Sequence, residues 1–258
     1  GNATVIEWAQ SVAHTYEPMR SMLAASYSLR DPIPSDEKTR GRVGTYVSHA
    51  SMAFVAALDA CVSDSDSMLR FAAFTALAYG ARGLFWRGAG ACAPIGSPRF
   101  TLLASINKRI AQWGNVFVSS KDGTQDYSDG GYNITKLYAT GYPLPSAVKP
   151  GSGGASDLVQ SADEDVLIAE LGSQGRYATP LLYVVDKRVE LQPGAAKVRT
   201  LHVTLRSDVT ATQPLEGDCA ASRCQCGLSN VGSTIAIRLP GGSGQLVALS
   251  LWDGMAAA

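Results

Sequence analysis

Hydrophobic and polar positions follow two different periods along this chain, and the change falls near residue 118. Before that point apolar residues recur mostly every three or four positions, which is typical of amphipathic helices. After it, short β-rich runs are separated by Gly, Pro and Ser, which is typical of strands joined by turns. The pattern predicts two domains, a helical α/β part over 1–118 and an antiparallel β-sandwich over 119–258.

The first half predicts four helices and two strands. The helices are expected over 3–16, 42–60, 66–79 and 99–117. Pro18 is expected to end the first helix, because a proline inside a helix removes a hydrogen bond and clashes with the preceding turn. The short apolar run MRSMLAASY at 19–27 predicts a buried strand, and GLFW at 83–86 predicts another.

The second half predicts a series of strands. They are expected over 132–138, 165–171, 176–186, 197–206, 233–239 and 245–252. KVRTLHVTLR at 197–206 alternates apolar with polar residues, as a half-exposed strand does. The segment PGSGGAS at 150–156 is interpreted as a flexible surface loop. It is not interpreted as a phosphate-binding loop, because no strand leads into it.

Composition narrows the class of protein. Of the 258 residues 46% are hydrophobic, and the formal net charge is zero. Such a chain can bury a core, and its charge favours neither nucleic acid nor an anionic membrane as a partner. No run of about 18 apolar residues occurs, so no membrane span is expected. The start, GNATVIEWAQ, does not have the pattern of a signal peptide, which leaves open that the chain begins downstream of one.

Cysteines and sequons point to an oxidising compartment. Three of the five cysteines, Cys219, Cys224 and Cys226, share the segment EGDCAASRCQCG; the others are Cys61 and Cys92. No fourth Cys or His lies near that segment, so a disulfide from Cys219 to Cys224 or to Cys226 is expected there rather than a metal site. Asn2 and Asn133 each begin an N-x-Thr sequon, a candidate for glycosylation. Together these features favour a secreted or extracellular protein with no metal and no cofactor.

Several stretches resemble one enzyme family. FTALAYGARGLFW, SINKRIAQWGNVF and VLIAELGSQGRYATPLLYVVDKRV follow in the order seen in the C-terminal part of β-galactosidase-like glycoside hydrolases, retaining enzymes with a TIM barrel. VIEWAQSVAHTYEPMRSMLAASYSLRDP is similar to the segment around barrel strand 6 of that family. The resemblance spans most of residues 1–205. It implies a partial (β/α) barrel-like N-terminal half followed by an antiparallel β-sandwich.

The catalytic part of that family does not transfer to this sequence. The resemblance places the general acid after barrel strand 4, upstream of this chain, and the nucleophile after strand 7. Strand 7 is expected between the helices at 42–60 and 66–79, where LDACVSDSDSML contains neither an apolar strand nor a Glu. Retaining hydrolysis needs two carboxyl groups about 5–5.5 Å apart. Only Asp31 follows a candidate barrel strand, and its simpler interpretation is a loop residue before Pro32.

Three residues are candidates for substrate binding. Trp86 and Arg87 end the last barrel-like strand, where an indole stacks on a sugar ring and a guanidinium binds hydroxyls. Tyr27 ends the strand expected at 19–27. Each also has a purely structural interpretation, as a packed aromatic or a surface arginine. The three histidines, His14, His49 and His202, are interpreted as surface or structural residues, since no nucleophile or metal motif accompanies them.

Two hypotheses about function follow. The first is a non-catalytic, glycoside-hydrolase-derived component of a larger assembly, structural or facing carbohydrate, with a protein partner or missing upstream polypeptide covering the open barrel edge. The alternative is the C-terminal portion of a retaining glycoside hydrolase that acts on a polysaccharide or oligosaccharide, with its catalytic glutamates outside this chain. An unrelated two-layer α/β domain joined to a sandwich remains a third interpretation.

Overall fold

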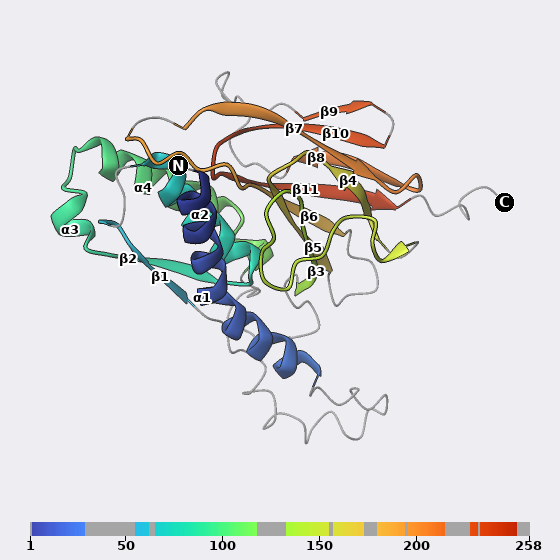
Figure 1. The fold of residues 1–258 in the computed structure, drawn as a ribbon, viewed down its shortest axis with the longest axis horizontal. Coiled ribbons are helices and arrows are strands. Elements are labelled where there is room, and N and C mark those ends of the chain that lie inside the picture. The colour runs from blue at the N-terminus through green and yellow to red at the C-terminus, as the bar shows by residue number, and fades with distance from the viewer. Residues whose placement is uncertain are drawn as a thin grey trace.

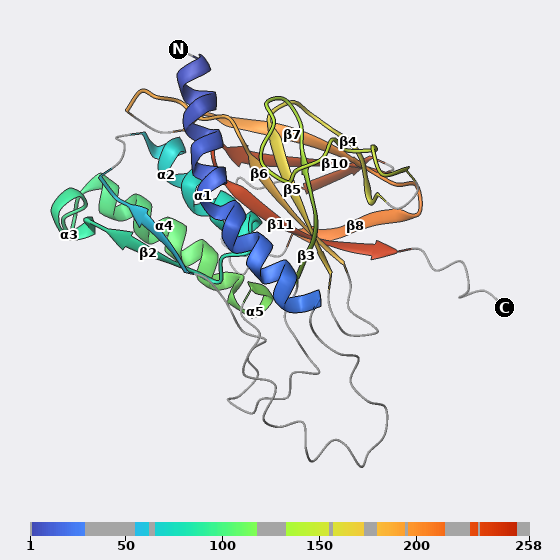
Figure 2. The ribbon, with the colours of Figure 1, turned by 60° about the horizontal axis from the view of Figure 1, so that its bottom comes forward.

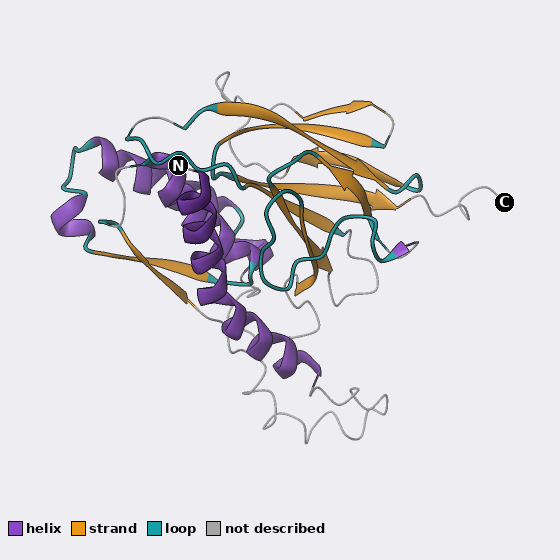
Figure 3. Ribbon diagram, viewed as in Figure 1, coloured by secondary structure: helices purple, strands orange, loops and turns teal. Residues whose placement is uncertain are grey.

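The protein is arranged in three layers: helices, a five-stranded sheet and a four-stranded sheet (Figure 1). A computed structural model describes residues 2–28, 55–61, 65–117, 133–154, 157–172, 180–193, 196–214, 228–231 and 233–251. Figure 3 shows helices α1 to α5, within residues 2–117, gathered on one side of the two large sheets. A small two-stranded sheet accompanies the helices at their outer side.

The elements alternate in the first half of the chain and are all strands in the second. The helices are α1 (Asn2–Ser28), α2 (Asp66–Ala78), α3 (Ala89–Cys92), α4 (Pro98–Gln112) and α5 (Gly114–Phe117). The strands are β1 (Val55–Asp59), β2 (Gly83–Arg87), β3 (Asn133–Ala139), β4 (Val159–Ala162), β5 (Val166–Gly172), β6 (Leu181–Asp186), β7 (Val198–Leu205), β8 (Val209–Pro214), β9 (Leu228–Val231), β10 (Thr234–Pro240) and β11 (Gly244–Leu251).

Two antiparallel sheets pack face to face in the second half. The five-stranded sheet has the order β3-β5-β6-β11-β8, and the four-stranded sheet has the order β4-β7-β10-β9. Leu201, Val203 and Leu205 of β7 are buried between the sheets, while His202 faces away. The alternation predicted for KVRTLHVTLR is thus confirmed, and the sandwich part of the expected fold is present.

The five-stranded sheet is buried on both faces. On β6, Leu182 and Val184 point into the core between the sheets, whereas Tyr183 and Val185 point into the core beneath the helices. β5 alternates in the same way. Strands buried on both faces are apolar throughout rather than alternating with polar residues. This explains why VLIAEL and LLYVV are almost uninterrupted apolar runs.

Helix α2 lies against the five-stranded sheet and joins the helical layer to it. Ser65 caps its start by accepting a hydrogen bond from the Met68 amide, and Asp66 places an acidic group in the first turn. Trp113, at the end of α4, contacts Phe74 of α2 and Tyr183 of β6, with ring centroids 6.1 and 5.7 Å apart. Both halves of the chain therefore share one core. The boundary expected at 118/119 falls outside the described residues and stays a prediction.

The partial barrel is wrong. β1, α2 and β2 form a βαβ unit in which β1 and β2 are parallel, with Val55 opposite Gly83 and Asp59 opposite Arg87. Within the described residues no other strand pairs with these two, and all the other strand pairs are antiparallel. Two strands cannot close a barrel. The helical layer instead buries its apolar surface against the five-stranded sheet.

Helix α1 corrects two further predictions. It runs through Pro18 to Ser28, so Pro18 does not end it and 19–27 is helical rather than a strand. The Met, Leu, Ala and Arg residues after Pro18 are good helix formers. Helix α1 lies beside α2 (Figure 2). Contacts with α2 hold the first part of the helix: the ring centroids of Trp8 and Phe71 are 5.7 Å apart, and the Tyr16 hydroxyl donates to the Ala72 carbonyl.

The prediction of a helix over 42–60 is wrong for the last residues of that range. Residues 55–59 are strand β1, and 42–54 lie outside the described residues. A strand therefore precedes α2 at the position where the sequence was expected to lack one. Small residues in VAALD fit either a helix or a strand, and pairing with β2 decides for the strand. The described residues also contain β4, β8 and β9, which the sequence did not predict. The helices at 66–79 and 99–117 and the strand at 83–86 are confirmed closely, although a turn at Trp113 divides 99–117 into α4 and α5.

Candidate functional site

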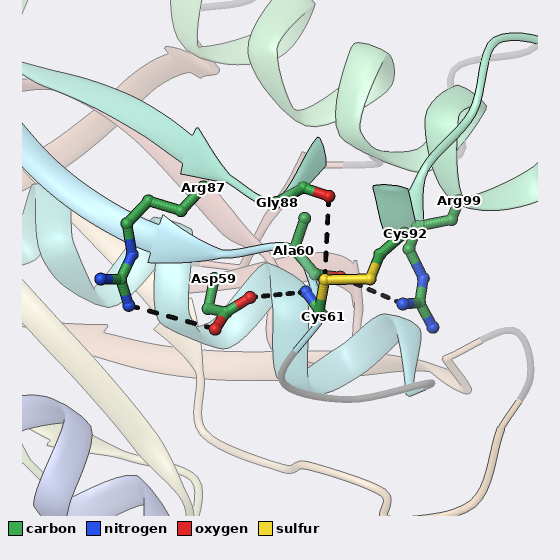
Figure 4. Close-up of a disulfide and its surroundings, with 7 residues drawn as sticks. All are labelled: Asp59, Ala60, Cys61, Arg87, Gly88, Cys92 and Arg99. Carbon is green, nitrogen blue, oxygen red and sulfur yellow. Dashed lines mark hydrogen bonds and ion pairs between the residues drawn. A yellow bond between two sulfur atoms is a disulfide. The ribbon is translucent and has the colours of Figure 1, made fainter. Parts of the chain in front are cut away.

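The best candidate site lies where the parallel strands β1 and β2 end, at their carboxyl ends (Figure 4). Asp59 is the last residue of β1 and stands opposite Arg87, the last residue of β2. Their side chains form an ion pair with 4.0 Å between the Asp59 Oδ2 and the Arg87 Nη2. The Asp59 Oδ1 accepts a hydrogen bond of 2.8 Å from the Cys61 amide, which fixes the carboxylate at the start of the turn.

Alternation along the two strands gives the small sheet an outer and an inner face. Ala56, Leu58, Leu84 and Trp86 face inward and belong to or pack against the core beneath the helices. The outer face carries Val55, Ala57 and Asp59 from β1, and Phe85 and Arg87 from β2. Val55 and Phe85 are each 61% exposed. An exposed aromatic ring thus lies on the same face as the Asp59–Arg87 pair.

Trp86 and Arg87 occupy opposite faces of this sheet. Trp86 is half-buried, and its indole Nε1 donates a 2.9 Å hydrogen bond to the Asn107 Oδ1 of α4, which ties β2 to that helix. Arg87 faces outward. The structure therefore does not bring the two predicted binding residues together on one surface. Tyr27 lies in α1, and its side chain is outside the described residues.

Phe85 is the neighbour that the sequence analysis missed. In a strand that packs one face on a helix, side chains alternate between the core and the outside. Because Leu84 and Trp86 are the apolar pair on the inner face, Phe85 and Arg87 must point outward together. The alternation in GLFWR already indicates that Phe85 and Arg87 share a face. It identifies a candidate site only once β1 is known to be a strand that contributes to the same face.

A disulfide closes the same end of the sheet. Cys61, just after β1, bonds to Cys92 at the end of α3, with 5.4 Å between the Cα atoms. Arg99 of α4 reaches the same turn, where its Nη1 donates a 3.1 Å hydrogen bond to the Ala60 carbonyl. The pairing expected for Cys219, Cys224 and Cys226 lies outside the described residues. Asn2 and Asn133 begin α1 and β3, and nothing tests their glycosylation.

A second polar cluster lies at one edge of the sandwich. Burial raises the pKa of the Glu170 carboxyl, which accepts hydrogen bonds from the Tyr138 hydroxyl and from the Leu158 amide. Asp157 binds the Lys136 ammonium and accepts from the Gly153 amide, and these contacts lower the pKa of its carboxyl although burial acts in the opposite direction. Tyr138 and Glu170 are buried between the sheets, so this cluster has the character of a structural network.

A buried lysine forms a third polar group. The Lys187 ammonium donates to the Tyr142 carbonyl and lies 3.7 Å from the centre of the Tyr142 ring. Burial lowers the pKa of Lys187 to about 8, and Asp165 opposes this shift. Lys187 follows Asp186, whose buried carboxylate accepts a forked pair of hydrogen bonds from Arg199. All of these groups are satisfied within the fold.

The described residues contain neither a metal-type cluster of side chains nor a helix that could span a membrane. Within these ranges no three His, Cys, Asp or Glu side chains gather as a metal would require. The Nδ1 atom of His202 lies 3.0 Å from the Asp163 Oδ2, and one carboxylate beside one imidazole does not make a metal site. No helix in the described part of the chain has both the length and the apolar character to cross a membrane.

Comparison with known proteins adds no relative. No protein-family model, no curated protein and no solved structure matches this chain.

Proposed function

We propose that this protein is a non-catalytic, carbohydrate-facing component of a larger assembly, derived from the hydrolase family that its sequence resembles. The observation that carries the proposal is the outer face of the β1–β2 sheet. Phe85 is exposed there beside Arg87 and Asp59, at positions fixed by the parallel register. The proposal moves the aromatic contact from Trp86, which packs inward, to Phe85.

The chemistry of this face suits a sugar. A pyranose ring presents an apolar C–H face that packs on an aromatic ring, and hydroxyls at its edge that bind charged groups. The Arg87 and Asp59 side chains are 65% and 44% exposed, and their mutual ion pair at 4.0 Å is long. Exposed ion pairs of this kind contribute little, so Arg87 can turn toward hydroxyls at low cost, and the Asp59 Oδ2 can accept from a hydroxyl while Oδ1 stays bound to the Cys61 amide.

Binding rather than hydrolysis is favoured by the charges on this face. A retaining hydrolase needs two carboxyl groups about 5–5.5 Å apart. Among the described residues at the carboxyl ends of β1 and β2, Asp59 is the one carboxylate, and it is paired with Arg87. Asp59 is therefore assigned to sugar binding, and no nucleophile or general acid is assigned.

Membership of a larger assembly is supported by the exposed parallel sheet. Parallel sheets are normally covered on both faces. Here Val55, Ala57 and Phe85 leave the outer face apolar and exposed, and in the described residues each strand pairs on one side alone. Unpaired strand edges are sites where another chain adds. The Cys61–Cys92 disulfide supports placing the protein in an oxidising, extracellular compartment.

Glycan binding tests the proposal directly. The intact protein is screened against a panel of oligosaccharides, and the tightest ligand is titrated into Phe85→Ala and Arg87→Ala. Each change is expected to weaken binding about five- to thirtyfold, since an aromatic or charged contact of this kind contributes about 1–2 kcal/mol. Phe100→Ala and Arg238→Ala are the matched controls, because both residues are exposed and belong to α4 and β10 rather than to the β1–β2 sheet.

The outcomes separate the two hypotheses. Binding that Phe85→Ala leaves unchanged, or no binding to any glycan, would contradict the proposed surface. Release of sugar by the unmodified protein that Asp59→Asn abolishes would instead favour the alternative, a retaining hydrolase.

A further inference from the structure

The Cys61–Cys92 disulfide bridges the two chain segments that leave β1 and β2. The cysteines are 31 residues apart, so the bond closes a loop that contains α2 and β2. Figure 4 shows the bond beside Gly88, directly after the Asp59–Arg87 pair. Cys61 is exposed and Cys92 is partly exposed, so a thiol in solution can reach the bond.

The segment 88–97, which contains α3, has few other attachments. None of the four residues of α3 is buried, and Ile95 is 90% exposed. Ala93 is buried, and Ala89 packs at the margin of the core. The disulfide is therefore the strongest link between this segment and the end of β1. Segments with few buried contacts are the ones that open locally while the rest of a fold persists.

Gly88 suits both redox states of the cysteines. It has a left-handed φ of 68°, and a Cβ there would lie 2.8 Å from the Cys61 Sγ. The same sulfur is 3.7 Å from the Gly88 carbonyl oxygen. In the disulfide this sulfur carries no proton, so the approach is only a contact. In the reduced protein the Cys61 thiol has this carbonyl as a ready acceptor.

We propose that the Cys61–Cys92 disulfide is a redox-sensitive clasp, which holds the segment 88–97 against the end of β1 and releases it on reduction while the three-layer fold persists. The proposal does not depend on carbohydrate binding. Because Gly88 follows Arg87 directly, release also frees the backbone on one side of the Asp59–Arg87 pair. The redox state of the bond would then set the geometry of the candidate site.

The chemistry needs a dithiol reductant. One thiolate of the reductant attacks the Cys61 sulfur, the bond to Cys92 breaks, and Cys92 leaves as a thiolate that takes up a proton. The second thiol of the reductant, as a thiolate, attacks the mixed disulfide and releases Cys61, which is then protonated. Two electrons and two protons pass to the protein, and the reductant leaves as its own disulfide.

Hydrogen exchange followed peptide by peptide tests the clasp, with dithiothreitol as the reductant. The amides of Ala91, Cys92 and Ala93, which bond within the turn of α3, are expected to exchange at least tenfold faster after reduction. The amides of α4 and β6 are expected to keep their protection. Mass mapping confirms which cysteines are reduced. Cys61→Ser/Cys92→Ser is the matched control, and it should exchange like the reduced protein with or without dithiothreitol.

Three results would overturn the proposal. The first is a bond that dithiothreitol fails to reduce in the folded protein. The second is reduction without faster exchange in 88–97. The third is loss of protection throughout the molecule, since the bond would then be a structural cross-link of the whole fold rather than a clasp on one segment.

Discussion

The clearest electrostatic effect in this protein comes from one buried side chain, that of Lys187. Lys187 is fully buried, yet its ammonium finds the Tyr142 carbonyl and ring, and its neighbours Asp165 and Asp186 are acidic. A buried cation needs such partners, because an unpaired charge in the interior is costly. The lowered pKa of Lys187 shows that burial outweighs the attraction of Asp165.

Titration of Lys187 is predicted to make the stability of the protein depend on pH. Its pKa is about 8 in the folded protein and about 10.4 in an unfolded chain. Between these values the unfolded state binds more protons, so the free energy of unfolding from this group rises with pH, by roughly 3 kcal/mol in all. Lys187→Met should remove this rise.

Urea denaturation at intervals between pH 7.5 and 9.5 measures the effect as the difference between the unmodified protein and Lys187→Met. Tyrosines of the unfolded state titrate alike in both proteins, so their contribution cancels in this difference. Lys197→Met is the control, since that side chain is exposed. Equal slopes for the unmodified protein and Lys187→Met would contradict the assigned pKa.

At the scale of elements, two prolines have opposite consequences. Pro18 lies inside α1, where it leaves the helix without one hydrogen bond. Pro98 lies at the first position of α4, where the missing amide costs nothing because the first turn has no partner for it. The same residue type thus strains one helix and starts the other.

Replacing these prolines should separate the two roles. Pro18→Ala is expected to stabilise the protein by about 1–3 kcal/mol, because proline in a helix interior is about 3 kcal/mol less favourable than alanine. Pro98→Ala, the matched control, is expected to change stability by less than about 1 kcal/mol. The midpoint of urea unfolding measures both. A destabilising Pro18→Ala would mean that the helix depends on a kink at this residue.

In the molecule as a whole, the five-stranded sheet contributes to both cores. The helices cover one of its faces and the four-stranded sheet covers the other. Trp113 is 2% exposed and contacts both α2 and β6 through their aromatic rings. The helical layer and the sandwich should therefore unfold together.

Trp113→Ala is predicted to cost about 3–5 kcal/mol, as large-to-small changes of buried aromatic residues do. Hydrogen exchange of α2 and of β6 should rise by similar factors, because both layers lose the same contact. Phe100→Ala, an exposed position on α4, should change neither. Loss of protection in α2 alone would show that the two halves are independent domains and would support the boundary at 118/119.

Elements with strong local signals could be predicted from the sequence. The capped helix at 66–79, the periodic helix at 99–117 and the alternating strand at 197–206 were predicted because caps and periodicity act within a few residues. The apolar strands at 165–171 and 176–186 were recognised too, although their double-sided burial was not. The alternation in GLFWR already contained the outward position of Phe85.

The remaining features depend on contacts between segments that are distant in the sequence. Helix α1 continues through 19–27 beyond Pro18, and pairing with β2 makes a strand of VAALD. The apolar surface of α2 packs against the five-stranded sheet, whose strands lie some hundred residues or more away in the sequence. No local pattern encodes this contact. The prediction of a partial barrel was wrong for this reason, because the sequence of a βαβ unit does not specify which other elements it packs against. Cys61 and Cys92 likewise meet only because two parallel strands end side by side.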